Sequence, residues 1–271
     1  MAIGIDITDP TTVPDTTKTK LNDGNDVVLP TNARSILALI PYYSQATPTT
    51  QKSVMTKIIV ESDDIALTPL ELLMPPLAIG QDVPIHPLYN TPWKIPVNIP
   101  VKGGDRIRIY AQGLLDSTTD PIVAVGIVLS DRPSSSPQLY AKVSDYTATG
   151  TTVDIDVAGG TLTLTNAHKL VEAWAATIPG ATASGDAING YAKFVSTSFS
   201  PPFPLKIPMP PVGVSLPSGV SGAVGVSALM PAPVRCPIDI AVQSPATIEV
   251  YAHYGDLPAA AGGFATCLMY R

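Results

Sequence analysis

The sequence predicts an all-β protein made of two tandem, related halves, and three observations support this. First, 29 prolines and 20 glycines accompany only 14% charged residues, which favours short strands and many turns over long helices. Second, a repeat relates residues 22–132 to residues 151–271. Third, apolar and polar residues alternate over several segments, as in half-buried strands. At 271 residues, the chain is long enough for each half to bury its own core.

The repeat consists of sequence matches that keep their order along the chain. Residues 29–35 match 163–169, residues 73–77 match 208–212, residues 94–101 match 235–242, residues 106–111 match 247–252, and both halves close on an apolar run at 122–129 and 263–270. The separation is 134 positions at Asn32 and Asn166 (166 − 32), and it reaches 141 at Pro96 and Pro237 (237 − 96). Because the separation drifts slowly, we expect that loops changed length while strands were retained.

The extent of the matches predicts how the chain is divided. We expect an N-terminal arm at residues 1–21, a first unit at 22–132, a turn-rich linker at 133–150 and a second unit at 151–271. The arm is rich in Thr, Asp and Pro, and we expect it to order only against neighbouring molecules. It lacks a basic segment followed by an apolar one, so no secretory signal is expected.

Period-two patterns predict individual strands in each unit. Ile95, Val97 and Ile99 alternate with Pro96 and Pro100, and since proline cannot donate to a sheet ladder, this strand should lie at a sheet edge or a bulge. The same applies to the matching segment that contains Pro237. Residues 35–41 and 167–178 are also predicted strands, although the latter has some helical spacing.

Two pairs of glycines predict hairpin turns. Gly103 and Gly104 precede the alternating segment 106–111, and Gly159 and Gly160 separate the alternating residues 153–157 from 162–164. Tight turns rich in glycine commonly join paired antiparallel strands. With about eight such segments in each unit, the sequence predicts two antiparallel sandwiches.

Charge and histidine content exclude several classes of function. The net charge of −6 and the pI of about 4.9 disfavour direct nucleic-acid binding, so no sequence-specific contact with nucleic acid is expected. The only histidines are His86, His168 and His253, and no His-x-His cluster supports the metal site of a bicupin enzyme. We predict no catalytic, cofactor-binding or metal-binding residue, and no enzymatic activity.

The remaining candidate residues each leave two interpretations open. Residues 22–26 and 61–64 are solvated acidic turns or, less favourably, calcium ligands. Cys236 and Cys267 are free buried thiols or one bridge. His253 is a hydrogen-bonded loop residue or part of a catalytic set. The aromatic residues Trp93, Trp174, Tyr42, Tyr43 and Tyr89 form core or interface packing, or else a sugar-stacking platform.

The tandem pattern resembles the double jelly-roll major capsid proteins of tailless icosahedral viruses, the lineage that includes the adenovirus hexon. The resemblance covers residues 22–271 and rests on the Asn-Ala, Met-Pro-Pro, proline-containing alternating and Tyr-Ala matches. It implies two duplicated eight-stranded jelly-roll sandwiches and a homotrimer that forms a pseudo-hexameric capsomer. It also implies contacts with neighbouring capsomers and minor capsid proteins, a virion location after assembly in the host cytoplasm, and in some cases an internal membrane beneath the shell.

Two other classes compete with this interpretation. A cell-surface or extracellular β-sandwich, such as a surface-layer or carbohydrate-binding protein, would share the fold, but the expected absence of a secretory signal counts against it. A hydrolase on the same scaffold would need clustered carboxylates, which the sequence does not display. The sequence therefore favours a structural role.

Overall fold

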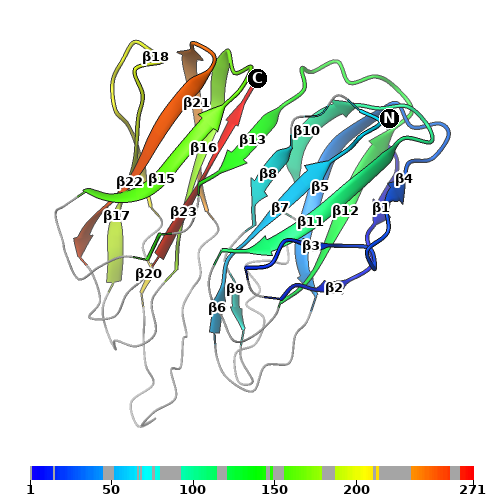
Figure 1. Cartoon of the computed structure of the whole chain (residues 1–271), viewed down its shortest axis with the longest axis horizontal. Helices are drawn as coiled ribbons and strands as arrows, with labels where there is room; N and C mark the ends of the chain where they lie inside the picture. Colours follow the sequence, from blue (N-terminus) through cyan, green and yellow to red (C-terminus); the bar gives the residue numbers. More distant parts are fainter. Residues whose placement is uncertain are drawn as a thin grey trace, which may run out of the picture.

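The computed structural model describes residues 2–14, 16–44, 52–65, 67, 69–74, 77–79, 93–114, 121–144, 147–148, 156–178, 187–209, 212–213, 233–256 and 263–271. Over these residues every regular element is a β-strand, and the sheets are antiparallel. The predicted all-β class is therefore confirmed. Figure 1 shows the strands of the two halves as separate stacks that stand side by side.

The first half contains two sheets, which we call sheets A and B. Sheet A has the order β1 (Ala2–Ile7), β12 (Ile122–Ser130), β5 (Ser35–Ser44), β10 (Ile95–Pro100), with β2 (Thr11–Thr12) also on β12. Sheet B has the order β3 (Thr19–Lys20), β11 (Arg106–Gly113), β7 (Thr56–Glu61), β8 (Leu70–Leu73), with β4 (Val27–Val28) also on β11. A short ribbon pairs β6 (Lys52–Val54) with β9 (Leu77–Ile79).

The second half contains sheets C and D. Sheet C has the order β13 (Tyr140–Val143), β23 (Gly263–Tyr270), β16 (Lys169–Ile178), β21 (Val234–Val242), β18 (Phe199–Ser200), with β14 (Thr147–Ala148) also on β23. Sheet D has the order β15 (Asp156–Leu164), β22 (Ala246–Asp256), β17 (Ala187–Val195), β19 (Leu205–Pro208), with β20 (Val212–Gly213) also on β17.

The two halves share one strand order. If the eight principal strands of a half are numbered along the chain, counting β3 and β4 as one, sheets A and C both have the order 1-8-3-6. Sheets B and D both have the order 2-7-4-5. In each half the first strand therefore pairs with the last, and every connection between consecutive strands except the fourth-to-fifth passes from one sheet to the other.

Individual hydrogen bonds recur at the separations found in the sequence. The Arg34 N–H donates to Ser130 O at 2.7 Å, and the His168 N–H donates to Arg271 O at 2.8 Å. The donors are 134 positions apart (168 − 34) and the acceptors 141 (271 − 130). Cross-strand neighbours recur in the same way: Tyr110 lies opposite Ile59, and Tyr251 lies opposite Lys193, again 141 and 134 positions apart (251 − 110, 193 − 59).

The predicted strand patterns are confirmed where the structure describes them. Ile95, Val97 and Ile99 of β10 are fully buried, whereas Pro96 and Pro100 are exposed, and β10 forms the edge of sheet A. The register also shifts between Pro96 and Ile99, which agrees with the preference of proline for sheet edges and bulges. The segments predicted at 35–41 and 167–178 belong to β5 and β16, so the ambiguous helical spacing of the second does not produce a helix.

Neither glycine pair forms the predicted hairpin. Gly103 and Gly104 connect β10 of sheet A to β11 of sheet B, so the chain crosses between facing sheets. A Cβ on Gly103 would lie 2.1 Å from the Thr31 carbonyl oxygen, which explains the need for glycine at this crossing. Gly159 and Gly160 instead lie inside the single strand β15, where the register against β22 shifts between Ala158 and Thr161. This pair forms a β-bulge, and the φ of +99° at Gly160 suits glycine.

The segments expected as an arm and a linker contribute strands. β1 pairs with β12 of the same chain from Ala2 to Ile7, so the segment is ordered within its own chain and not only by neighbouring molecules. In the expected linker, β13 pairs with β23 from Tyr140 to Val143. The reason is topological: β1 and β13 supply the first strand of sheets A and C, respectively.

Candidate assembly surfaces

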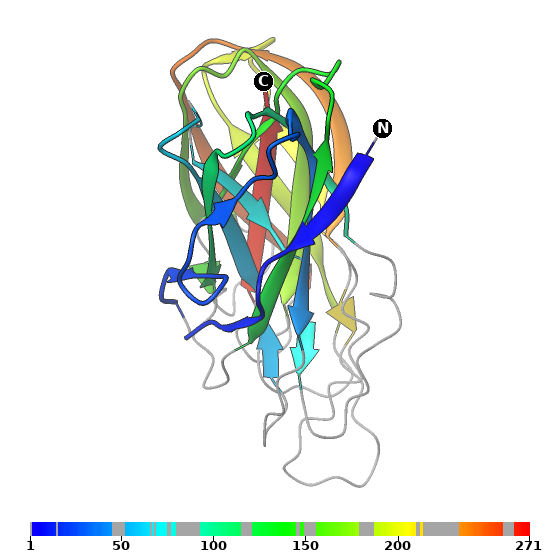
Figure 2. The same cartoon turned by 90° about the vertical axis from the view of Figure 1, so that its right-hand side faces the viewer.

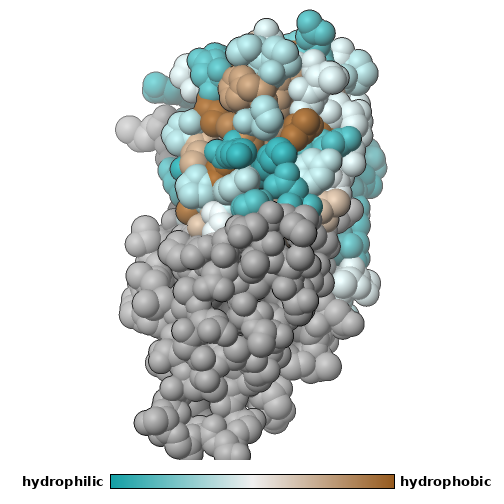
Figure 3. Space-filling view, turned by 90° about the vertical axis from the view of Figure 1, so that its left-hand side faces the viewer, coloured by the Kyte–Doolittle hydropathy of each residue, from teal (hydrophilic) through white to brown (hydrophobic). Residues whose placement is uncertain are grey.

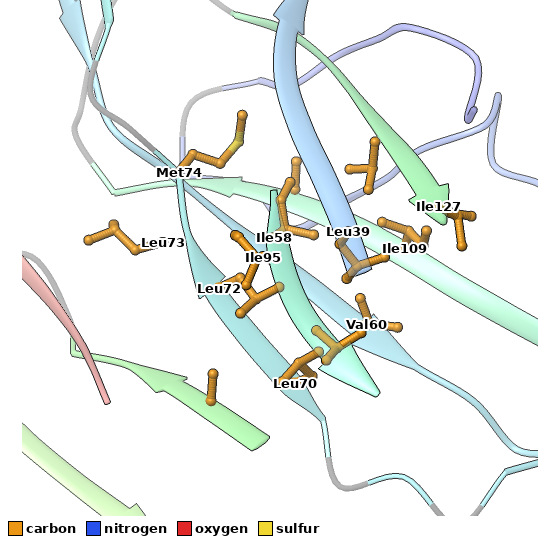
Figure 4. Packing of buried hydrophobic residues seen from close by; sticks show 14 of the residues in the cluster. Leu39, Ile58, Val60, Leu70, Leu72, Leu73, Met74, Ile95, Ile109 and Ile127 are labelled. Atoms are coloured by element: carbon orange, nitrogen blue, oxygen red, sulfur yellow. The ribbon is translucent and has the colours of Figure 1, made fainter. Parts of the chain in front are cut away.

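The two halves meet through an apolar junction between sheets B and C. One continuous cluster of buried hydrophobic residues includes the core of the first half and, from the second half, Ala141, Val143, Trp174, Ala176, Ala265, Cys267 and Met269. Strand β8 lies beside β13 and β23 at this junction (Figure 1). In Figure 4, Leu72 points into the core of the first half, whereas Leu73 lies on the opposite side of β8. Both are fully buried, so the two halves share their packing.

Glu71 is the central charged group of the junction. Its carboxylate accepts a hydrogen bond from Lys142 of the second half, and the Lys57 Nζ of the first half lies 3.5 Å away. The Val143 N–H also donates to it at 3.4 Å. Only 10% of the Glu71 side chain is exposed. Since a buried charge without partners is costly, this carboxylate specifies how β8 meets β13.

Two tryptophans and an ion pair form a second part of the junction. Trp93, which precedes β10, contacts Trp174 of β16 edge-to-face, with ring centroids 5.7 Å apart. The Arg235 guanidinium lies 5.3 Å from the Trp93 ring and 4.8 Å from the Trp174 ring. Arg235 also donates two hydrogen bonds to Glu172, of 2.7 and 2.9 Å. These rings serve packing between the halves, as one of the two interpretations predicted, and Trp174 is fully buried.

Both cysteines are free thiols as one interpretation predicted, and Cys267 is buried, whereas Cys236 is only half-buried. Cys267 lies within the junction, and its thiol donates to the Glu71 carbonyl oxygen at 3.8 Å. Burial raises the pKa of Cys267 to about 12 and also raises the pKa of the half-buried Cys236. Both thiols are therefore protonated and poorly nucleophilic at neutral pH.

The outer face of sheet A presents apolar side chains to solvent. Ile7 of β1 is 55% exposed and Tyr42 of β5 is 38% exposed, and Ile40 between them is half-buried. Figure 2 views the molecule from this side, with β1 in front. Exposed apolar groups that gather on one sheet face are typical of a contact surface.

The outer face of sheet D carries charged and aromatic side chains, and Figure 3 shows hydrophilic residues among apolar ones on this side of the molecule. The rings of Tyr191 and His253 stack with centroids 4.6 Å apart, and the Lys206 Nζ lies 4.6 Å from the Tyr191 ring. The Asp156 carboxylate accepts from Lys193 at 2.6 Å and contacts His253 Nδ1 at 3.2 Å. The hydrogen bond from Lys193 is the main cause that lowers the pKa of Asp156. This face carries fixed charges and flat rings on a rigid sheet.

The structure places the other candidate residues apart from one another. His253 lies in strand β22 and not in the predicted loop, and His168 is exposed in the turn before β16. His86 and Tyr89 lie outside the described residues, as does the Tyr43 side chain. Over the described part of the chain, no group of three or more His, Cys, Asp and Glu residues could hold a metal ion, and no helix is long and apolar enough to cross a membrane.

The two acidic segments behave as turns with local partners. Asp26 pairs with Lys20 at 2.5 Å, and this hydrogen bond is the main cause that lowers the pKa of Asp26. Asp63 accepts two hydrogen bonds from the Arg108 guanidinium, each 2.7 Å, and Asp64 accepts the Arg106 N–H at 2.8 Å. Their oxygens are used within sheet B and its loops, as the interpretation as turns predicts.

Sequence reasoning did not single out Glu71, Glu172 or Arg235. A signal was present for Glu71, because it interrupts the apolar run of β8 at residues 70–73. An acidic residue between leucines in a short strand indicates either an exposed face or a buried ion pair. Its partner Lys142 lies 71 positions later, so only the fold brings the two together.

Comparisons with solved structures find chains from virus particles. The chain is similar to one in the cryo-EM structure of the T=1 Penaeus vannamei nodavirus, with 8% identity, coverage of 99% of this chain and 98% of that chain, and a TM-score of 0.26. For a chain of the T=3 particle of the same virus, the identity is 10%, the coverage is 98% of this chain and 89% of that chain, and the TM-score is 0.22. For a chain of the infectious bursal disease virus Gx strain, the identity is 9%, the coverage is 100% of this chain and 72% of that chain, and the TM-score is 0.24. No family model and no curated protein sequence matches the chain.

Proposed function

We propose that this chain is a structural major capsid protein of a tailless icosahedral virus, built from two duplicated eight-stranded jelly rolls as in the adenovirus hexon lineage. The observation that carries the proposal is the double occurrence of one strand order, with hydrogen bonds that recur at separations of about 134 and 141 positions. Convergence on a strand order is common, but residue-level register in two halves favours duplication of one ancestral unit.

The unpartnered sheet faces support an assembling protein. The junction between the halves uses the outer faces of sheets B and C, and in the described part of the chain no further sheet faces the outer sides of sheets A and D. Three copies would present two similar blocks each, so a homotrimer would form a pseudo-hexameric tile. Such a capsomer would contact neighbouring capsomers and minor capsid proteins, and an internal membrane beneath the shell is a further proposed partner.

The proposed division follows the repeat and adds the new strands. The units at residues 22–132 and 151–271 are extended by β1 (Ala2–Ile7) and β13 (Tyr140–Val143), respectively. The protein would act in the virion after assembly in the host cytoplasm. Neither catalysis nor direct recognition of a nucleic-acid sequence forms part of this proposal.

A carbohydrate-binding surface protein is the second candidate, and the outer face of sheet D favours it. Tyr191 and His253 form a flat, partly exposed stack between charged groups, and such rings can pack on sugars. The Lys206 and Asp156 side chains beside them could supply hydrogen bonds.

Light scattering coupled to size-exclusion chromatography separates the two candidates. The capsid proposal predicts a particle of about 85 kDa, three times the chain mass of 28.3 kDa, and larger closed shells in electron micrographs under assembly conditions. A chain that stays monomeric across a hundredfold range of concentration and binds glycans on an array would refute the capsid proposal and support the second candidate.

A further inference from the structure

The contact between the two halves is of a head-to-tail type. Sheet B of the first half meets sheet C of the second, and these sheets are not equivalent in strand order. The sheets equivalent to B and C are D and A, respectively, and over the described residues neither has another sheet against its outer side. They lie at opposite sides of the molecule, as Figures 2 and 3 show. A contact between unlike faces can be repeated from copy to copy.

Residues on the free face of sheet A match residues that the junction buries in sheet C. Ile7 lies opposite Gly126, and Val143 lies opposite Cys267. Because these two partners are separated by the repeat distance of 141 positions (267 − 126), Ile7 in sheet A is equivalent to Val143 in sheet C. Val143 is 2% exposed and Ile7 is 55% exposed. In the same way Ala176 matches Tyr42, since their partners Ala265 and Ala124 are 141 positions apart (265 − 124). Ala176 is fully buried, whereas Tyr42 is 38% exposed. Sheet A therefore exposes apolar groups where sheet C is covered.

The charges at the central position of the junction are reversed on the free faces. Glu71 lies opposite Ile59, and Lys206 lies opposite Lys193, so Lys206 occupies the place of Glu71 (206 − 71 = 135, 193 − 59 = 134). Asp6 lies opposite Ile127, and Lys142 lies opposite Leu268, so Asp6 occupies the place of Lys142 (268 − 127 = 141). The junction thus pairs an acid on β8 with a base on the edge strand β13. Sheet D offers a base on β19, and the edge strand β1 of sheet A offers the acid Asp6, which like Lys142 lies beside a core residue and reaches the contact from the sheet edge.

We propose that sheet D of one copy docks on sheet A of the next copy of this chain, with Lys206 paired to Asp6 across the contact. The proposal rests on the proposed assembly function and names its surfaces. Lys206 and Asp6 are both exposed, and in the described part of the chain no carboxylate forms an ion pair with Lys206. The contact between copies would be more polar than the junction, because Tyr191 and Lys193 replace Lys57 and Ile59.

The reversed charges also distinguish the two kinds of contact. Lys206 would repel Lys142 at a wrongly matched contact, and Glu71 would repel Asp6. Sheet B would therefore bind sheet C more favourably than sheet A, and sheet D would bind sheet A more favourably than sheet C, because like charges destabilise the mismatched contacts. Because the pair between copies would lie near solvent, its contribution should weaken with salt.

Charge-reversal variants of the full chain test the contact. We would compare wild type, Asp6→Lys, Lys206→Glu and the combined variant by light scattering over a series of concentrations. Each single variant places like charges together, and we expect its association midpoint to rise at least about tenfold. The combined variant restores an opposite pair, with a midpoint within about threefold of wild type. Asp131→Lys combined with Lys102→Glu, at exposed positions after β12 and β10, makes the same two charge changes outside the proposed pair and is the matched control.

The outcomes separate this inference from the function on which it rests. A wild type that forms trimers, with single variants that associate equally well, would overturn the contact and leave the capsid proposal standing. A wild type that is monomeric throughout would overturn both. Hydrogen exchange of the β1 amides reports whether Asp6→Lys disturbs β1, and Lys206→Glu probes the same contact from β19. Failure of the combined variant to recover, with both single variants folded, would also overturn the pairing.

Discussion

Removal of the Glu71 carboxylate should destabilise the junction between the halves. Glu71→Ala removes the shared partner of Lys57 and Lys142. In the folded protein 11% of the Lys57 side chain and 35% of the Lys142 side chain are exposed. Breaking a buried ion pair typically costs about 3–5 kcal/mol. Lys142 is partly hydrated, however, and can turn toward water, so we discount the value to about 2–3 kcal/mol.

Urea denaturation measures this effect directly. We expect the midpoint to fall for Glu71→Ala, and to fall less for Glu71→Gln, whose amide oxygen still accepts a hydrogen bond from one lysine. In a double-mutant cycle with Lys142→Met, the two losses should be less than additive because the residues share one interaction. A loss below about 0.5 kcal/mol for Glu71→Ala, or full additivity in the cycle, would refute the assignment of Glu71 as the charge that specifies the junction.

Three further predictions concern other described residues. Trp174→Ala should cost about 3–5 kcal/mol in urea denaturation, more than Trp93→Ala, because Trp174 is fully buried whereas Trp93 is only partly buried; equal losses would contradict this. A thiol reagent at pH 8 should react with Cys236 first and with Cys267 only on unfolding, since burial raises the pKa of Cys267 to about 12; rapid labelling of both would contradict it. The pKa of Asp156 is lowered in the folded state, so its ionised form stabilises the protein above a pH of about 4 and this contribution is lost as pH falls through the folded value. Asp156→Asn should therefore flatten the acid side of the stability profile, and an unchanged profile would count against the pairing with Lys193.

Local patterns predicted strands well and their partners poorly. The alternation of Ile95, Val97 and Ile99 identified β10 and its edge position, because burial and proline chemistry are properties of the segment itself. The prediction of hairpins at Gly103 and Gly159 was wrong. A glycine-rich turn has the same sequence whether the next strand pairs with the preceding one or crosses to the facing sheet. β15 shows the same limit, because a bulge and a turn both favour glycine.

The assembly surfaces were the least predictable part of the chain. Alternating Ile3, Ile5 and Ile7 was a strand signal in a segment whose composition otherwise indicated an arm. The repeat aligned residues 73–77 with 208–212, and two positions earlier it would have set Glu71 against Lys206. The role of Glu71 and Lys206 depends on Lys142 and Asp6. These two residues occupy equivalent positions only because their strands pair with β23 and β12, respectively. Such relations are tertiary and leave no local pattern.

The position of the last strand in each half has a consequence for folding order. β12 lies between β1 and β5 in sheet A, and β23 lies between β13 and β16 in sheet C. Neither sheet can therefore form completely before the final strand of its half is available. Pairing of β1 must wait for residues 122–130, a loop closure of more than 100 residues, and such distant pairings make folding slow. During synthesis, β1 would emerge long before its partner and stay unpaired. The apolar face of sheet A would thus be completed late, which limits premature association between nascent chains.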